Sequence, residues 1–142
     1  MQLTDHDLQM LREAATSAAL KAGNLISSHT TKDLDVKRKG TGDSLASDVV
    51  TEVDVMAQEL ILKMLKKVTK IYDLGTLGEE SPDNHERFEK DYFWAIDPID
   101  GTLPFINREH GYSTSIALVS KEGEPVIGVI FDPMTGNLHY AV

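Results

Sequence analysis

Two long segments with helical periodicity precede a second half that is built from short apolar runs. Apolar residues recur every three to four positions from Thr4 to about His29, and again from about Val50 to Thr69, which predicts two amphipathic helices. Thr4 and Asp7 resemble a capping box at the start of the first helix, although Asp replaces the usual Glu or Gln. Two helices followed by strands favour an α+β domain with a largely antiparallel sheet.

Five short apolar runs predict the strands of that sheet. The first leaves the core at Gly78, where "LGEES" turns polar, and the second is "YFWAI" at 92–96. The other three runs cover residues 114–120, 126–132 and 138–142. The sequences "KEGE" and "PMTG" between these three are typical of hairpin connections. The polar segment 30–44 is expected to be a mobile loop, and the polar segment 81–91 an excursion from the sheet.

The bulk properties exclude several classes of function. With 142 residues, the chain suits a single domain spanning 1–142. A net charge of −9 argues against binding to a nucleic-acid backbone, and no apolar run approaches the ~20 residues that span a bilayer. The absence of cysteine excludes thiolate chemistry and is compatible with a cytoplasmic location, which we expect. The same negative charge would repel a phosphorylated substrate unless bound cations reverse the field locally.

The stretch "WAIDPIDGT" places Asp97 and Asp100 where an apolar strand ends. Asp-Pro and Asp-Gly are common in turns, so a purely structural turn is one interpretation. The surrounding sequence favours a polar site, because Glu79 and Glu80 also follow an apolar segment and Asp54 lies at the start of the second helix. Several carboxylates are therefore candidates for one site.

Crowded carboxylates repel one another and raise one another's pKa unless a cation neutralises them. Oxygen ligands without cysteine favour Mg²⁺ over Zn²⁺. Asp97 could bridge two ions, a turn at Pro98 and Ile99 could add a backbone carbonyl, and Asp100 could serve the second ion. The N–H groups after Gly101 would form an anion site. Two cations beside an anion site suit phosphoryl transfer to water.

Other motifs with clustered aspartates do not fit the spacing. An EF-hand loop needs acids at its first, third and fifth positions, where this chain has Asp97, Ile99 and Gly101. A phosphatase of the haloacid dehalogenase type has Asp-x-Asp, and this chain has Asp-x-x-Asp. An aspartic protease has Asp-Thr-Gly, whereas the order here is Asp-Gly-Thr.

These residues resemble the inositol monophosphatase superfamily of Mg²⁺-dependent, lithium-sensitive phosphatases. Three motifs match in order: "DVVTEVD" (48–54), "GEES" (78–81) and "WAIDPIDGT" (94–102), and the segments 111–119 and 125–142 look like the strands that follow. The match runs over nearly the whole chain but covers only the N-terminal half or so of a family member. It implies a fold like the N-terminal domain of the sugar phosphatase (fructose bisphosphatase-like) fold.

The resemblance implies two or three Mg²⁺ ions and assigns their ligands. Glu79 and Asp97, with the carbonyl of Ile99, would hold the first ion. Asp97 and Asp100 would hold the second. Glu79, which the resemblance also counts as catalytic, would reach a third ion through waters.

The remaining roles implied by the resemblance concern water and phosphate. Thr102, hydrogen-bonded to Asp54, would orient and help deprotonate the metal-activated water that attacks phosphorus. The backbone amides of Gly101 and Thr102 would bind the phosphate. Glu80 would support the metal ligands without binding an ion itself.

The basic run Lys37-Arg38-Lys39 lies within the polar segment 30–44. Its simplest interpretation is a solvated surface, and the alternative is a loop that faces phosphate. The resemblance adds that one of its lysines could help to close the site.

The departure from the family lies beyond the third motif. Family enzymes carry a further Asp in a Trp-Asp motif of their C-terminal half, together with most substrate contacts, and this chain holds neither. The chain also stops at "LHYAV", within a predicted strand. We therefore expect the N-terminal metal-binding half of such a phosphatase, as an impaired fragment, a split polypeptide or part of something longer.

The substrate is indicated less directly than the chemistry. The residues Leu103-Pro104-Phe105 match neither the Thr-Asn-Phe of inositol monophosphatases nor the Lys-Glu-Phe or Lys-Glu-Tyr of bisphosphate nucleotidases. We favour inositol monophosphate or a similar small polyol phosphate, because the segment 81–91 is short. A 3'(2'),5'-bisphosphate nucleotidase and a histidinol-phosphate phosphatase are alternatives, and a non-catalytic metal-binding or interaction domain is an alternative from another class. We also expect a homodimer, and neither nucleic acid nor a membrane as a partner.

Overall fold

The computed structural model describes residues 1–29, 36–38 and 49–142. The helices are α1 (Asp5–Ser27), α3 (Glu52–Ile71), α4 (Glu86–Glu89) and α5 (Thr102–Ile106). The strands are β1 (Val36–Arg38), β2 (Val49–Thr51), β3 (Gly75–Gly78), β4 (Tyr92–Asp100), β5 (Ser113–Ser120), β6 (Pro125–Asp132) and β7 (Asn137–Ala141).

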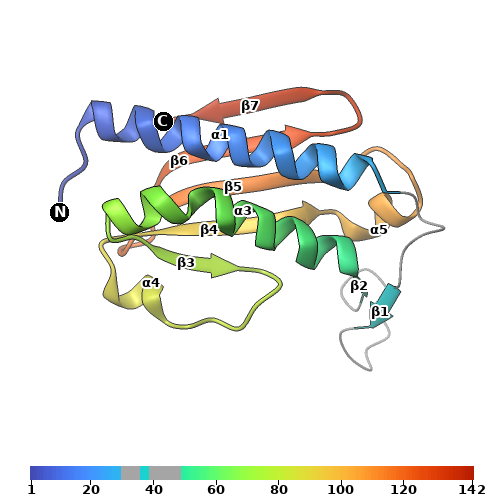
Figure 1. Ribbon diagram of the computed structural model, residues 1–142, viewed down its shortest axis with the longest axis horizontal. Coiled ribbons are helices and arrows are strands. Elements are labelled where there is room, and N and C mark those ends of the chain that lie inside the picture. The colour runs from blue at the N-terminus through green and yellow to red at the C-terminus, as the bar shows by residue number, and fades with distance from the viewer. Residues whose placement is uncertain (30–35, 39–48) are drawn as a thin grey trace.

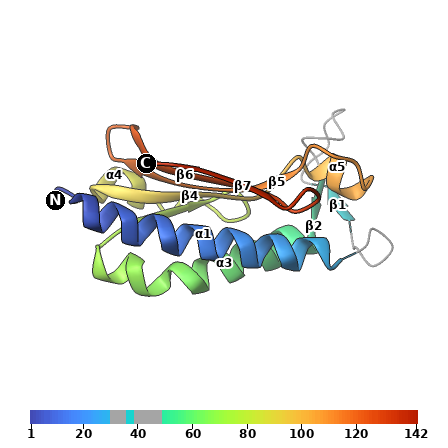
Figure 2. The ribbon, with the colours of Figure 1, turned by 90° about the horizontal axis from the view of Figure 1, so that it is seen from above.

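The main layer is a five-stranded sheet with the order β3-β4-β5-β6-β7. All neighbouring strands are antiparallel except β3 and β4, which are parallel. The helices α1 and α3 lie side by side over one face of this sheet (Figure 1) and form a second layer when the molecule is turned (Figure 2). The prediction of an α+β fold with two helices on a largely antiparallel sheet is confirmed.

The start of α1 is fixed by the capping box that the sequence predicted. The backbone N–H of Thr4 donates to Asp7 Oδ2 at 2.8 Å, and the backbone N–H of Asp7 donates to Thr4 Oγ1 at 3.2 Å. The hydroxyl of Tyr72 donates to Asp7 Oδ1 at 3.0 Å. The hydrogen bonds that the Asp7 carboxylate accepts from the Thr4 backbone, the Thr4 hydroxyl and the Tyr72 hydroxyl lower the pKa of Asp7. Asp7 thus joins the start of α1 to the residue that follows α3.

Small side chains let α1 come close to the sheet that it covers. Four of its fully buried residues are alanines, at positions 15, 18, 19 and 22. A Cβ atom at Gly23 would lie 2.2 Å from the ring of Phe131 on β6. The helix can pack at this distance only because position 23 has no side chain.

The core lies between the helix pair and the sheet. Along β5, Ile116 and Leu118 are fully buried against the helices, whereas Ala117 between them faces the other side. Burial of each large apolar side chain contributes roughly 1.5–3 kcal/mol. Trp94 on β4 is also fully buried, and its ring Nε1–H donates to Thr69 Oγ1 on α3 at 3.1 Å. This bond satisfies the one polar atom of the indole.

Two sequence predictions, one of a loop and one of a helix start, are corrected by the structure. The loop expected at 30–44 is wrong at 36–38, where β1 pairs antiparallel with β2. The second helix begins at Glu52 instead of Val50, because Val49–Thr51 are held in that pairing. The rest of the expected loop, including Lys39, lies outside the residues that the structure describes. The excursion 81–91 contains the short helix α4.

The turn expected at Pro98 and Ile99 is also wrong. Strand β4 continues to Asp100, and its pairing with β5 changes register between Asp97 and Asp100. Proline lacks an N–H and is tolerated where the ladder is irregular. The Pro98 carbonyl accepts a hydrogen bond from the buried hydroxyl of Thr114 on β5 at 2.9 Å. The two aspartates therefore leave the sheet from an irregular strand end.

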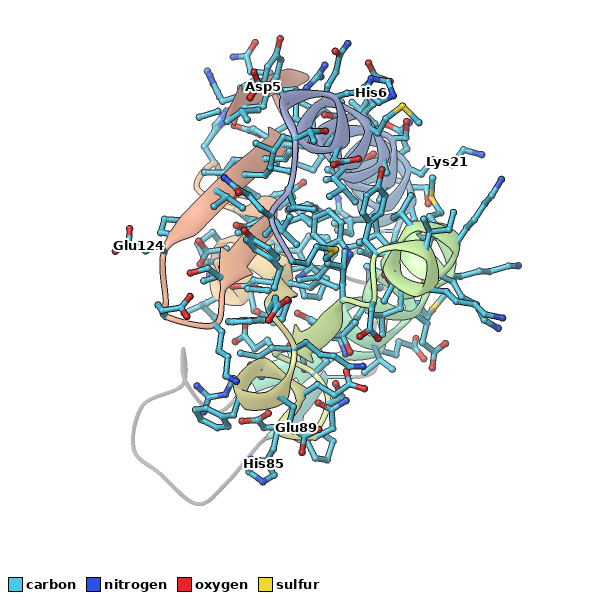
Figure 3. The ribbon with its side chains drawn as sticks, turned by 90° about the vertical axis from the view of Figure 1, so that its left-hand side faces the viewer. Asp5, His6, Lys21, His85, Glu89 and Glu124 are labelled. Carbon is cyan, nitrogen blue, oxygen red and sulfur yellow. The ribbon has the colours of Figure 1, made fainter. Side chains whose placement is uncertain are left out.

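Charged side chains surround the two layers. Lys21, Glu89 and Glu124 are exposed and point away from the interior (Figure 3). In the described part of the chain, no helix has the length and apolar character needed to cross a membrane.

Candidate functional site

The carboxyl ends of β3 and β4 bring the second and third acidic motifs together. These strands are parallel and paired from Gly75↔Phe93 to Gly78↔Ile96, so they end at the same edge of the sheet (Figure 1). The backbone N–H of Glu79 continues this pairing by donating to the Ile96 carbonyl at 3.1 Å. Glu79 therefore lies beside Asp97, although 18 positions separate them in the sequence.

Asp97 is half-buried and surrounded by other acids. Burial, a hydrogen bond with Glu79, and the negative charges of Glu79, Asp100 and Asp54 together raise the pKa of Asp97 to about 8. We call Asp54, Glu79, Asp97 and Asp100 the carboxylate cluster. The crowding that the sequence predicted is present around Asp97. In the metal-free protein this environment favours the protonated form of the carboxyl.

One oxygen of Asp97 has no hydrogen-bond partner. Its Oδ1 atom is buried, and no donor among the described residues contacts it. A buried carboxylate oxygen without a partner is costly. An atom in this position is suited to a ligand that the protein itself does not supply.

Asp54 enters the site from the first turn of α3. Its side chain is fully buried, and the Thr102 hydroxyl on α5 lies 3.5 Å from Asp54 Oδ1 and 3.4 Å from the Ile99 carbonyl. Both distances are long, and a hydroxyl has one proton to donate. The structure thus places Thr102 between Asp54 and the end of β4. The proposed role of Thr102 toward water stays a prediction.

Gly101 forms the connection from β4 to α5. Its φ of 89° lies in the left-handed region that favours glycine, and a Cβ atom there would lie 2.5 Å from the Gly111 carbonyl oxygen. The Gly101 carbonyl accepts from the Phe105 N–H at 3.2 Å. Backbone geometry and close packing both require glycine here. Asp100, just before it, is exposed to solvent.

Two residues at the site escaped the sequence analysis. Gln58 on α3 is 4% exposed and accepts from the backbone N–H of Glu80 at 2.9 Å, and Thr114 holds the Pro98 carbonyl. Gln58 follows Asp54 by one helical turn, so it shares a face with it. In the sequence, Gln58 was recognisable as a polar residue next to the apolar stripe of the second helix. The partly exposed Glu80 lies against Gln58 through its backbone.

A pocket of about 470 Å³ opens next to Glu79 and Asp97. It is lined by residues 77–79, 81, 83, 95–97, 115 and 117. Ala95 pairs with Ala117, which lies on the sheet face turned away from the core. The pocket therefore connects the carboxylate cluster with the sheet face opposite the helices.

The residues fit a hard divalent cation in donor type. All candidate donors are oxygens, and Asp97 Oδ1 has no hydrogen-bond partner among the residues that the structure describes. The raised pKa of Asp97 indicates a site that disfavours further negative charge. As they stand, no three acidic or histidine side chains of the described residues converge into a ready metal site. The ligand roles of Glu79, Asp97, Ile99 and Asp100 remain predictions.

Comparisons with known proteins identify the family of this chain. The profile of the "Inositol monophosphatase family" matches residues 7–142. The chain is 36% identical over 129 residues to "Nus factor SuhB" of Escherichia coli, covering 89% of this chain and 45% of that protein. It is 36% identical over 135 residues to "Inositol-1-monophosphatase" of Synechocystis, covering 95% of this chain and 44% of that protein.

A solved structure shows the same fold. The crystal structure of CysQ from Bacteroides thetaiotaomicron, described as "a bacterial member of the inositol monophosphatase family", superposes with a TM-score of 0.68 at 33% identity. The match covers 92% of this chain and 45% of that one. The chain thus spans about half the length of the relatives it matches. From the profile match and the shared fold, the chain belongs to the inositol monophosphatase family.

Proposed function

We propose that the protein acts as a Mg²⁺-dependent phosphomonoesterase on inositol monophosphate or a similar small polyol phosphate. Family membership supports a phosphatase-type hydrolase. The observation that carries the proposal is Asp97, whose pKa is raised to about 8 by burial and neighbouring carboxylates and whose Oδ1 has no partner among the described residues. Such a site favours binding of a cation over further negative charge.

Four residues would hold the cations. Glu79, Asp97 and the Ile99 carbonyl are proposed for the first Mg²⁺, Asp97 and Asp100 for the second, and Glu79 through waters for a third. Bound Mg²⁺ would supply the positive charge that offsets the carboxylate cluster and polarises a phosphate. Occupation of the site would lower the pKa of Asp97 and release its proton.

The residues around Thr102 would handle water and phosphate. Asp54 is buried and accepts a hydrogen bond from the Thr102 hydroxyl. It can therefore orient the hydroxyl oxygen of Thr102 toward an attacking water. Gly101, in the left-handed conformation, is the N-cap of α5, and the amides of Gly101 and Thr102 at this helix start would donate to phosphate oxygens. Glu80 would support the site through its contact with Gln58.

The first experiment tests metal-dependent turnover. Phosphate release from inositol monophosphate is measured with Mg²⁺, with chelator and in the variant Asp97→Asn. We expect activity that requires Mg²⁺ and is lost in Asp97→Asn, while the exposed control Glu124→Gln keeps it. Unchanged hydrolysis in chelator or in Asp97→Asn would refute the mechanism.

Two alternatives are tested with the same assay. Likeness to "3'(2'),5'-bisphosphate nucleotidase CysQ" of Salmonella typhimurium, 38% identical over 93 residues, favours a bisphosphate nucleotidase as the second candidate. A panel that adds 3'-phosphoadenosine 5'-phosphate and histidinol phosphate decides between substrates. A metal-binding or interaction domain that does not turn over alone is the alternative from another class. Assays of this chain by itself and joined to the C-terminal half of a relative separate those cases.

The remaining expectations also stay proposals. We propose a cytoplasmic homodimer with a small phosphorylated substrate and with no nucleic-acid or membrane partner. One relative, from Escherichia coli, is named "Nus factor SuhB". A direct measurement of RNA binding by the present chain tests the proposal, and we expect no binding. Light scattering measures the oligomeric state.

A further inference from the structure

The side chain of Gln58 is an uncharged group buried beside the carboxylate cluster. It is 4% exposed and lies on α3, one helical turn after the fully buried Asp54. An amide in such a place must satisfy both its carbonyl and its NH₂ group. The hydrogen-bond partners of Gln58 therefore identify the segment that its side chain fixes in place.

Both partners belong to the turn that carries Glu79. The Gln58 Oε1 atom accepts from the backbone N–H of Glu80 at 2.9 Å. The Gln58 Nε2 group donates to Ser81 Oγ at 3.0 Å. The side chain thus binds the two residues that directly follow Glu79. Since the Glu79 N–H is bound to the Ile96 carbonyl of β4, the acidic residue is held on both sides.

The backbone before Glu79 is shaped to receive this amide. A Cβ atom at Gly78 would lie 2.5 Å from three atoms of the Gln58 side-chain amide. Contacts this short do not occur, so the amide can reach the turn only because position 78 is glycine. The fit involves both partners: a glycine in "GEES" and a glutamine 20 positions earlier.

We propose that Gln58 is a positioning residue that sets where Glu79 stands relative to Asp97 and thereby sets the affinity of the site for a divalent cation. The inference rests on the proposed metal-dependent function and extends it to a residue with no ligand role. α3 then serves both halves of the site, because Asp54 contacts Thr102 and Gln58 holds the turn after β3. Residues that hold metal ligands in place typically change metal affinity 10- to 100-fold when altered.

The experiment compares four proteins with the wild type. Gln58→Met keeps the length and loses both hydrogen bonds, and Gln58→Asn keeps an amide that is one methylene too short. Gln58→Glu keeps two acceptor oxygens for the Glu80 N–H and the Ser81 hydroxyl. The matched control is Thr69→Val, which removes another buried hydrogen bond of α3, to Trp94, away from the site.

Two quantities are measured on the full chain: Mg²⁺ affinity by calorimetry, and hydrogen exchange of the Glu80 amide by NMR. We expect Gln58→Met and Gln58→Asn to bind Mg²⁺ roughly 10- to 100-fold more weakly and to lose protection of the Glu80 amide. Thr69→Val should retain both. Gln58→Glu adds a negative charge that itself acts on the cation, so it is judged by the protection of the Glu80 amide, which it should retain. A loss of affinity in Thr69→Val equal to that in Gln58→Met would show a general stability effect and overturn the inference.

Failure of the inference and failure of the proposed function are distinguishable. Wild-type protein that binds no Mg²⁺ would refute the metal-dependent function. Wild-type affinity in Gln58→Met or Gln58→Asn, or an unchanged exchange rate at Glu80, would refute the positioning role while leaving that function intact. Gln58→Asn remains polar and provides the answer if Gln58→Met does not fold.

Discussion

Replacing the ionisable carboxyl of Asp97 with an amide should stabilise the metal-free protein at neutral pH. In the variant Asp97→Asn, the side chain keeps its size and can still donate a hydrogen bond to Glu79, as the protonated wild-type carboxyl does. It no longer has an ionised form that burial and the neighbouring acids oppose. The same change abolishes the proposed cation site, so stability and function should move in opposite directions.

The magnitude follows from the pKa of Asp97, which is raised from 3.8 to about 8. Between these values the folded protein binds a proton that the unfolded chain does not bind, so the free energy of unfolding falls as pH rises. The full contribution is present below the unfolded pKa and is lost as pH approaches 8. Each pH unit corresponds to about 1.4 kcal/mol, which gives at most about 4 kcal/mol at pH 7. Asp97 is only half-buried, so solvent screening reduces this limit, and we expect Asp97→Asn to gain about 1 to 4 kcal/mol.

The assay is urea unfolding in chelator at several values of pH between about 4 and 8. The difference between Asp97→Asn and wild type should be near zero at about pH 4 and should grow as pH rises toward 8. Addition of Mg²⁺ should stabilise the wild type by about 2.7 kcal/mol at 100 times its dissociation constant. It should leave Asp97→Asn unchanged. The exposed control Glu124→Gln should follow the wild type throughout.

Two results would contradict the reasoning. One is an Asp97→Asn variant that is no more stable than wild type at pH 7.5 in chelator. The other is a stability difference that does not depend on pH, because it would trace the gain to packing and not to the ionisation of Asp97.

Three further substitutions test the local structure of the site and of α1. Gly101→Ala forces a side chain into a left-handed backbone 2.5 Å from the Gly111 carbonyl, and we expect a loss of more than about 1–3 kcal/mol in thermal unfolding. Thr114→Val leaves the buried Pro98 carbonyl without its hydroxyl partner, and it should cost about 1–3 kcal/mol by urea unfolding; wild-type stability would show that the bond contributes nothing. Thr4→Ala removes the capping box of α1 and should cost about 1 kcal/mol, whereas an unchanged midpoint would mean that the helix end frays without effect.

Local pattern was sufficient where a segment's own residues decide its structure. The two amphipathic stripes predicted α1 and α3, and the box at Thr4 marked the start of the first helix within one residue. The apolar runs predicted all five strands of the main sheet. These predictions succeeded because an element that buries one face has apolar residues at regular intervals along its sequence.

The failures occurred where pairing with a distant strand overrides local preference. Val50 belongs to a helical stripe, yet it pairs with Lys37 in a two-stranded sheet. The Asp-Pro and Asp-Gly pairs indicate a turn, yet β4 runs on to Asp100 beside β5, and Thr114 holds the Pro98 carbonyl. In both places a partner far along the chain supplied the hydrogen bonds that decided the conformation.

By itself, the sequence determined the fold class, the two helices, the acidic motifs and the preference of their oxygens for a hard cation. Tertiary structure alone decided that these motifs meet. Parallel pairing of β3 with β4 places Glu79 against Asp97, and α3 carries Asp54 and Gln58 to the same edge of the sheet. The raised pKa of Asp97 follows from burial and from charges that lie up to 43 positions away in the sequence. Local periodicity encodes which face of an element is buried, but the electrostatic field at a carboxylate depends on distances in space, which only the folded chain sets.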